Sequence, residues 1–269
     1  MVLIVTSFGA TKNYPDPEMM RQTLAAFLGS LDAQTDKSFR LFVSCHDHPG
    51  PEFNRPWAEW HSIAVPGDDT FDKARIPVHF PSSAGEEVEY RVACSDGKLT
   101  DMGRKTFNSV IEAGRWAHRN GLREFWMLRM DSDDLLWRAM VEYLHLLQEP
   151  FRAVYNRKCH MIDYRLREMA VHDFPASTTV NALRYRLTVS GVFDLDWYYH
   201  CRDHTTFART VREDNIPYLE KDFTLCIVTN SGNSISGRPE IDKEKNVQKI
   251  AITPALAERY GLDAYLSRA

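Results

Sequence analysis

An apolar run that ends in a cluster of acids constrains the fold of this chain more than any other feature. Phe125–Met130 is nearly continuous in apolar residues, with Arg129 as its charged exception. Such a run is typical of a strand buried on both faces of a sheet. It stops at Asp131-Ser132-Asp133-Asp134. Three carboxylates therefore follow directly on the carboxyl end of a predicted buried strand.

Strand and helix patterns alternate along the N-terminal half of the chain. Short apolar or β-branched runs predict strands, and apolar residues three and four apart predict helices. The predicted strands are Val2–Thr6, Phe39–Ser44 and His61–Val65, and the apolar faces of the predicted helices run over 20–31, 107–114 and 136–147. This order predicts an α/β fold with a mainly parallel central sheet and helices on both faces.

The remaining segments have weaker patterns. Residues 66–100 are rich in Pro, Gly, Asp and Ser, which predicts a long loop with one short strand at Val88–Val92. After Pro150 the predicted strands are Ala153–Tyr155, His160–Tyr164, Met169–His172 and Phe223–Thr229, with helices at Tyr198–Asn215 and Pro254–Tyr260. No linker separates the two parts, so a single domain over residues 1–269 is predicted.

The composition argues against several classes of protein. Lys and Arg number 33 and Asp and Glu 37, a formal charge of −4, so a basic surface that coats nucleic acid is not expected. Five scattered cysteines are typical of reduced thiols, and the N-terminus lacks the features of a signal peptide, which together predict a cytoplasmic protein. No stretch approaches about 18 consecutive apolar residues, so no transmembrane span is expected. Peripheral association with a membrane stays open.

The three carboxylates predict a site for a hard divalent cation. Two like charges about 4 Å apart repel by on the order of 4 kcal/mol at an effective dielectric near 20. Carboxylates suit Mg²⁺ or Mn²⁺, and open α/β sheets bind ligands at the carboxyl ends of their strands. The competing interpretation is that Ser132 or Asp133 caps a helix that begins at Leu135. A cap accounts for one acid and not for three.

These segments together resemble a known family. The stretch Arg129-Met130-Asp131-Ser132-Asp133-Asp134 is similar to the Asp-x-Asp motif of GT-A glycosyltransferases, and residues 23–43 are similar to their first helix and second strand, joined by an S-x-x-x-Q-T turn at Ser30–Thr35. Residues 101–105 and 230–236 resemble the rhamnosyltransferase group. The resemblance implies a Rossmann-like GT-A sheet. It also implies that residues 1–134 bind a nucleotide sugar and that 135–269 form a mixed β/α acceptor half.

The activity that the resemblance implies is metal-dependent hexosyl transfer. A sugar, rhamnose by the likeness to that group, would move from a nucleotide-diphosphate donor to a hydroxyl of a glycan or other acceptor. Asp133 would bind Mn²⁺ or Mg²⁺, and Asp131 would contact the metal shell or the ribose. Many members add a late His ligand, which this chain lacks at the comparable Asn230. Either Asn230 supplies an amide oxygen, or fewer protein ligands hold the metal, or the two loops do not correspond.

Several other residues are candidates for contacts with the donor. Arg104 and Lys105 begin a helix predicted to lie beside the acid-bearing strand, where basic groups suit a diphosphate, although a solvated helix start explains them nearly as well. Arg129 lies in an apolar strand and needs an acid or the diphosphate as its partner. Thr6, at the end of the first strand, and Asp47, after the second, are expected to border the nucleotide base.

Transfer with inversion needs a general base, whereas transfer with retention does not. The resemblance places such a base near the start of a helix after the acidic motif, where Asp203 and His204 are the candidates. Asp203 alone also fits an N-cap. The rival bases are Glu213, Asp214, Glu220 and Asp222, and the adjacent Trp197–Tyr199 supply flat faces that suit either a sugar or the core.

Two other functions remain alternatives. Nucleotidyltransferases and phosphohydrolases also use clustered carboxylates, commonly around two metals about 4 Å apart and with acids from several strands. One dense cluster in this sequence disfavours them. A non-catalytic nucleotide-sugar-binding protein would keep the fold without a complete metal site, an alternative that the missing late His leaves open.

Overall fold

The structure is a computed structural model of the 269-residue chain. It describes residues 1–8, 16–45, 47–62, 76–81, 87–92, 101–163, 165–174, 178, 180–189, 193–195, 198–201, 204–229 and 247–262. For residues 62, 76–81, 87–92, 101–105, 107, 198, 201, 204 and 205 it describes the backbone and not the side chain.

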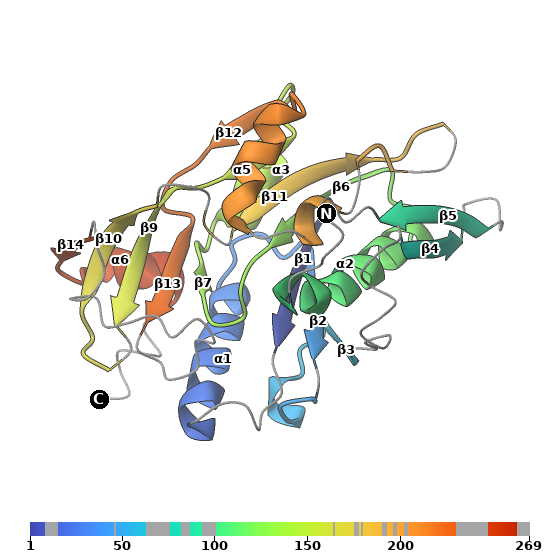
Figure 1. Ribbon diagram of the computed structural model, residues 1–269. Helices are drawn as coiled ribbons and strands as arrows, with labels where there is room; N and C mark the ends of the chain where they lie inside the picture. The colour runs from blue at the N-terminus through green and yellow to red at the C-terminus, as the bar shows by residue number, and fades with distance from the viewer. Residues whose placement is uncertain are drawn as a thin grey trace.

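Strands and helices alternate along the chain in the order shown in Figure 1. The strands are β1 (Val2–Phe8), β2 (Phe39–Cys45), β3 (Ala58–Ser62), β4 (Ile76–Pro81), β5 (Glu87–Val92), β6 (Glu124–Arg129), β7 (Leu135–Leu136), β8 (Ala153–Tyr155), β9 (Lys158–Asp163), β10 (Met169–Asp173), β11 (Asn181–Arg186), β12 (Tyr218–Glu220), β13 (Leu225–Thr229) and β14 (Val247–Ile250). The helices are α1 (Pro17–Asp32), α2 (Asp101–Arg119), α3 (Met140–Leu146), α4 (Tyr198–Cys201), α5 (His204–Glu213) and α6 (Pro254–Tyr260).

Seven of the strands form a central sheet in the order β12-β8-β11-β6-β1-β2-β3. The neighbours β6, β1, β2 and β3 are parallel to one another. β11 is antiparallel to both β6 and β8, and β12 is parallel to β8. The predicted α/β class, with a mainly parallel central sheet between helices, is confirmed.

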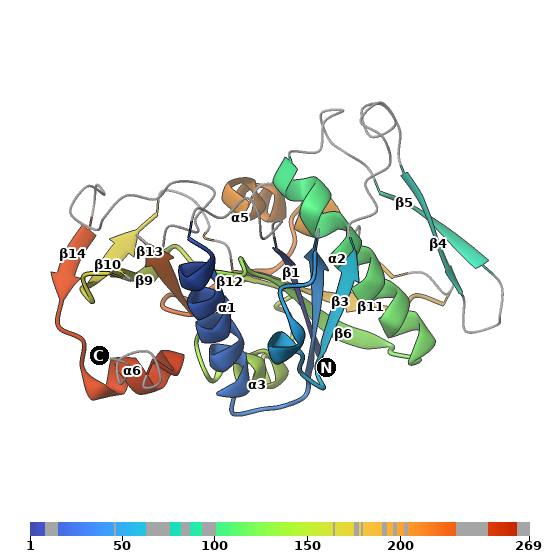
Figure 2. The same ribbon diagram turned by 90° about the horizontal axis from the view of Figure 1, so that it is seen from below.

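Helices cover both faces of this sheet, with α1 and α3 on one face and α2 and α5 on the other (Figure 2). α1 begins where Asp16 accepts a hydrogen bond from the Met19 N–H at 3.0 Å, with Pro17 in the first helical position. Its predicted apolar face from Met20 to Leu31 is buried. α2 ends as predicted near Gly121, whose φ of +65° is one that glycine adopts at no steric cost.

A second sheet lies beside the first, in the order β14-β10-β9-β13-β7 (Figure 1). α6 packs against it through Ala257 and the fully buried Tyr260. β6 belongs to the central sheet and β7 to the second sheet, and residues 130–134 connect them. The acidic segment therefore crosses from one sheet to the other.

Several predicted elements need correction. The third strand, predicted at His61–Val65, begins earlier, at Ala58, because Ala58–Ser62 pairs in parallel with Leu41–Cys45 of β2; residues 63–65 lie outside the described residues. The single strand predicted at Val88–Val92 is one arm of an antiparallel hairpin of β4 and β5. The strands β11, β12 and β14 were not predicted. The predicted helix at Tyr198–Asn215 corresponds to two helices, α4 and α5.

Two predictions from composition can be compared with the described residues. The thiols of Cys45, Cys159 and Cys226 are buried. In the described part of the chain, no helix combines the length and apolar character needed to cross a bilayer.

Candidate functional site

The order of the strands places the acidic loop at the point where the direction of the central sheet reverses. From β1 the chain passes through α1 to β2 on one side, and it later returns through α2 to β6 on the other side. In open α/β sheets of this kind, ligands bind outside the carboxyl ends of the strands at such a switch point. β1 and β6 are the two strands that flank it, and Asp131 follows β6 by two positions.

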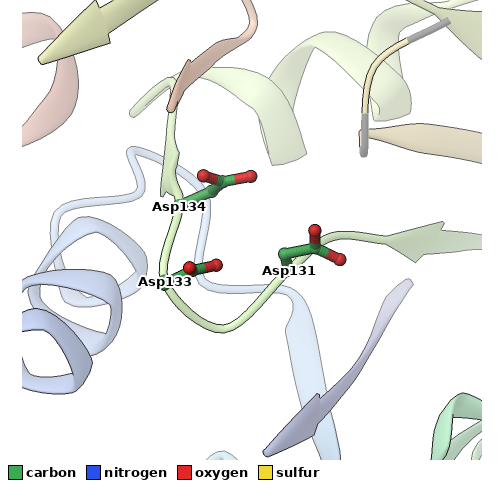
Figure 3. Close-up of side chains that lie close together, drawn as sticks. All are labelled: Asp131, Asp133 and Asp134. Carbon is green, nitrogen blue, oxygen red and sulfur yellow. The ribbon is translucent and has the colours of Figure 1, made fainter. Parts of the chain in front are cut away.

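The loop brings three carboxyl groups together. One ligand oxygen from each of Asp131, Asp133 and Asp134 lies within 4.8 Å of the other two. Figure 3 shows the carboxyl groups of Asp133 and Asp134 directed from one arm of the loop toward the arm that carries Asp131. Asp131 and Asp133 are half-buried, and Asp134 is 1% exposed.

This arrangement fits a divalent cation. Two unit negative charges 4.8 Å apart repel by about 3.5 kcal/mol at an effective dielectric of 20. A cation among the three carboxylates would convert this repulsion into attraction, and a set of oxygen ligands suits Mg²⁺ or Mn²⁺. The side chains present therefore have the chemistry and the convergence that a small hard cation requires.

Backbone and hydroxyl contacts hold the loop where it leaves β6. The Met130 N–H donates to the Val5 carbonyl at 3.2 Å, which continues the ladder of β1 and β6 beyond the last strand residue. The Ser132 hydroxyl donates to the Ser7 carbonyl at 2.9 Å. A turn bond from the Asp134 N–H to the Asp131 carbonyl, at 3.3 Å, folds the acids back on one another.

The far end of the loop is fixed by the second sheet. A carboxylate oxygen of Asp134 accepts a hydrogen bond from the Val228 N–H in β13 at 3.4 Å, and Leu135 and Leu136 pair with β13. No helix begins at Leu135, so the capping interpretation of Ser132 or Asp133 is wrong. The helix predicted over 136–147 starts only at Met140, the first residue of α3, and Leu136 belongs to β7.

Thr6 and Asp47 lie at the ends of the neighbouring strands. Thr6 pairs with Val43 one step beyond the Val5–Arg129 pair, and its hydroxyl is fully buried without a hydrogen-bond partner among the described residues. Asp47 is exposed, two residues after β2. Burial, together with the charge of Asp47, raises the pKa of the Cys45 thiol to about 11.

Arg129 is buried at 2% exposure beneath α4. Its guanidinium donates to the His200 carbonyl at 3.4 Å. His200 is fully buried, and burial, together with the charge of Arg129, lowers its pKa to about 3. α4 is thus attached to the strand that carries the acids, a contact that links residues 71 apart in the sequence.

Several other predicted residues lie outside the described residues or have only their backbone described. Asp203 and Asn230 lie outside the described residues, as do Trp197 and residues 231–236. Arg104 and Lys105 belong to the first turns of α2, and His204 is the first residue of α5, but only their backbone is described. Asn230 follows directly on β13, the strand whose Val228 donates to Asp134.

Two of the rival bases have described structural contacts. Asp214 accepts a hydrogen bond from the Tyr199 hydroxyl at 2.6 Å. Asp222 accepts the N–H of Lys158, the first residue of β9, at 2.9 Å. Both carboxylates therefore help to hold neighbouring elements together.

The sequence alone did not reveal how the loop is supported. Asp134, predicted only as part of the cluster, has a carboxylate that also binds β13, and Ser132 ties the loop to β1. Ser30 and Gln34 form buried hydrogen bonds to residues 136–141. The S-x-x-x-Q-T turn was the one available signal for the last pair, and it gave no indication of their partners.

The chain matches no protein-family model and no curated protein. Among solved structures it is similar to a "putative nucleotide-diphospho-sugar transferase" from Desulfovibrio desulfuricans G20. The two chains are 9% identical with a TM-score of 0.37, and the match covers 99% of this chain and 97% of the other. These values are too low to support an inference about activity. The function must therefore be inferred from the topology and side chains of this chain.

Proposed function

We propose that this chain is a metal-dependent glycosyltransferase that moves a sugar from a nucleotide-diphosphate donor to an acceptor hydroxyl. The observation that carries the proposal is the convergence of Asp131, Asp133 and Asp134 at the switch point of a mainly parallel sheet. The Asp-x-Asp resemblance of this loop points to the same activity. Rhamnose is the sugar to test first, because the likeness that suggested this enzyme class was to the rhamnosyltransferase group.

The roles proposed for the site residues follow from their positions. Asp133 and Asp131 would hold Mn²⁺ or Mg²⁺, with Asn230 as a candidate third ligand from the loop after β13. When bound, such an ion acts as a Lewis acid on the leaving diphosphate. Asp134 orients the loop, because its carboxylate also receives the Val228 N–H.

The donor would lie across the carboxyl ends of β1, β2 and β6. Thr6 and Asp47 stand at the first two of these strands, on the side proposed for the base and ribose. Arg104 and Lys105, in the first turns of α2, are proposed to face the diphosphate. Arg129 would contribute indirectly, by holding α4 in place, since its guanidinium donates a hydrogen bond to the His200 carbonyl.

The experiment that tests this function is a thermal-shift series with nucleoside diphosphates and their sugars, each with and without Mn²⁺. We expect stabilisation by one nucleotide class only when Mn²⁺ is present, followed by sugar transfer to a hydroxyl acceptor. Transfer of the nucleotidyl group to an acceptor, with release of sugar 1-phosphate, would instead identify a nucleotidyltransferase. Hydrolysis of the diphosphate without transfer would identify a phosphohydrolase. Binding of the donor without any turnover would identify a binding protein.

Replacing Lys105 with alanine tests the diphosphate contact. The variant should bind a nucleoside diphosphate about tenfold more weakly than the wild type and should bind the bare nucleoside equally well, because only the former presents phosphate oxygens. Calorimetry with both ligands checks this, and the matched control is Lys37→Ala, which replaces an exposed lysine shortly before β2. Equal losses for both ligands would rule out a phosphate contact.

Replacing Asp203 and His204 in turn tests the general base. α4, which ends two residues before Asp203, contacts the acid-bearing strand, and this supports a position of the segment near the reacting groups. If Asp203 or His204 is the base, its replacement by asparagine should lower kcat by about 10²- to 10⁴-fold with little change in donor affinity. If kcat is unchanged in both variants, the base lies elsewhere or the reaction proceeds with retention, which product stereochemistry distinguishes.

A further inference from the structure

Two buried side chains, one from α1 and one from the turn after it, bind the segment that follows the acidic loop. Ser30 is fully buried, and its hydroxyl accepts the Leu136 N–H at 3.1 Å. Gln34 is 1% exposed, and its amide group donates to the Trp137 carbonyl at 2.9 Å. Both side chains therefore bind backbone groups within three residues of Asp134.

Gln34 also replaces a missing helix cap. α3 begins after Ala139, which has no side chain that could accept an N–H from the first turn. The Gln34 carbonyl oxygen accepts the Val141 N–H at 3.2 Å, so a residue two positions after α1 caps α3 from a distance of 107 positions in the sequence. One amide side chain thereby joins the start of α3 to Trp137, the residue that follows β7.

These bonds continue outward along the same segment. The Thr35 N–H donates to the Arg138 carbonyl at 2.8 Å, and the Trp137 N–H donates to the Thr224 carbonyl at 2.9 Å. The backbone of 136–141 is thus fixed between α1 and the second sheet. Its N-terminal end is separated from Asp134 by Leu135 alone, so its position determines where the last two acids lie.

We propose that Ser30 and Gln34 are positioning residues of the cation site. They hold the backbone of residues 136–141 and thereby keep Asp133 and Asp134 in the arrangement that converges on Asp131. This inference rests on the proposed metal-dependent function. It assigns a role to the S-x-x-x-Q-T turn, which touches none of the three carboxylates.

Two readouts other than activity test this role. Mn²⁺ affinity is measured from the electron paramagnetic resonance signal of the free ion, and backbone exchange over residues 131–141 is followed by hydrogen–deuterium exchange without metal. The variants are Gln34→Met, which keeps the length but removes the amide, and Ser30→Ala. The matched control is Gln22→Met, the same change within α1, where the amide donates to Glu18 at the surface.

We expect Gln34→Met to bind Mn²⁺ about tenfold more weakly and to exchange at least about tenfold faster over 131–141, because orienting contacts around metal ligands typically change affinity by 10- to 100-fold. Gln22→Met should match the wild type in both. If Gln34→Met does not fold, the same two measurements on Ser30→Ala test the positioning role. That variant removes a single hydrogen bond, to the Leu136 N–H.

The outcomes separate this inference from the proposed function. A wild type that binds Mn²⁺, with a folded Gln34→Met variant of equal affinity, overturns the positioning role alone, even if that variant melts earlier. A wild type without Mn²⁺ affinity overturns both the metal site and its positioning residues.

Discussion

Substitution of Asp133 by alanine should abolish the response of the protein to Mn²⁺. At a metal concentration 100 times the Kd, binding stabilises a native protein by about 2.7 kcal/mol, which raises Tm by about 5–10 °C for a chain of this size. The variant should show no such rise, because the remaining two carboxylates are too few to replace the lost ligand. Scanning calorimetry of both proteins, with and without Mn²⁺, measures the difference.

Asp173→Ala is the matched control for this experiment. Asp173 is a half-buried acid in β10, paired with Arg157 at 3.4 Å and separate from the acidic loop. It should keep the full metal-induced rise in Tm. Asp134→Ala should lose the rise and also lower Tm without metal, since the Val228 N–H loses its acceptor, at a cost of about 1–3 kcal/mol. A full rise in Asp133→Ala would exclude this residue as a ligand.

The acid-bearing strand was predictable because one local signal dominates it. An apolar run that stops at several acids identifies both a buried strand and its carboxyl end, and β6 lies within one residue of the predicted bounds. The segment after it was predicted incorrectly. Leu136 has the spacing of a helix with Met140 and Leu144, but Ser30 and β13 take up its backbone groups, so it lies in a strand.

The sequence did not predict strand β11, and the reason differs from that for Leu136. Asn181 and Arg184 interrupt its apolar pattern, although the strand lies in the middle of the sheet. Arg184 is 6% exposed because it lies over the Trp126 ring at 4.7 Å and pairs with Glu149 at 3.0 Å. These partners come from distant segments, so local periodicity does not reveal the burial.

The candidate site, too, was only partly predictable from local sequence patterns. The three acids at the carboxyl end of β6 were predictable because a single loop presents them. The groups that support this loop come from α1, β1 and β13, which are distant in the sequence. Hydrogen bonds of this kind depend on tertiary packing and leave no periodic signal.

A second large effect is expected in the dependence of stability on pH, and it arises from two buried histidines. Burial, together with the charge of Arg129, lowers the pKa of His200 to about 3. Burial, together with the charge of Arg259, lowers the pKa of His160 to about 4. In an unfolded chain both would have a pKa of about 6.5. The native state therefore keeps both imidazoles neutral at a pH where the unfolded chain binds protons.

The sign of the effect follows from this difference. Below pH 6.5 the unfolded state carries more protons than the native state, so the free energy of unfolding falls as the pH falls. The loss continues until the pH reaches the folded pKa, near 4 for His160 and near 3 for His200. Between pH 7 and pH 5 each histidine should lower the free energy of unfolding by about 2 kcal/mol. This is a sizeable part of a typical protein stability of about 5–15 kcal/mol.

Replacing His200 with phenylalanine should remove about half of this pH dependence. The His200 ring lies among aromatic neighbours, 5.9 Å from Tyr185 and 6.2 Å from Phe207, and neither of its nitrogens has a hydrogen-bond partner among the described residues. Phenylalanine fits such surroundings without giving up a bond, so stability at pH 7 should be retained. Equilibrium urea unfolding at pH 7 and pH 5 should show a loss of unfolding free energy about 2 kcal/mol smaller than that of the wild type.

Phe207→Leu is the control, because it disturbs the same cluster without removing a titrating group and should keep the wild-type difference between the two pH values. Equal losses in His200→Phe and the wild type would mean that His200 takes up its proton in the native state, and that the contact between α4 and Arg129 does not keep the imidazole neutral.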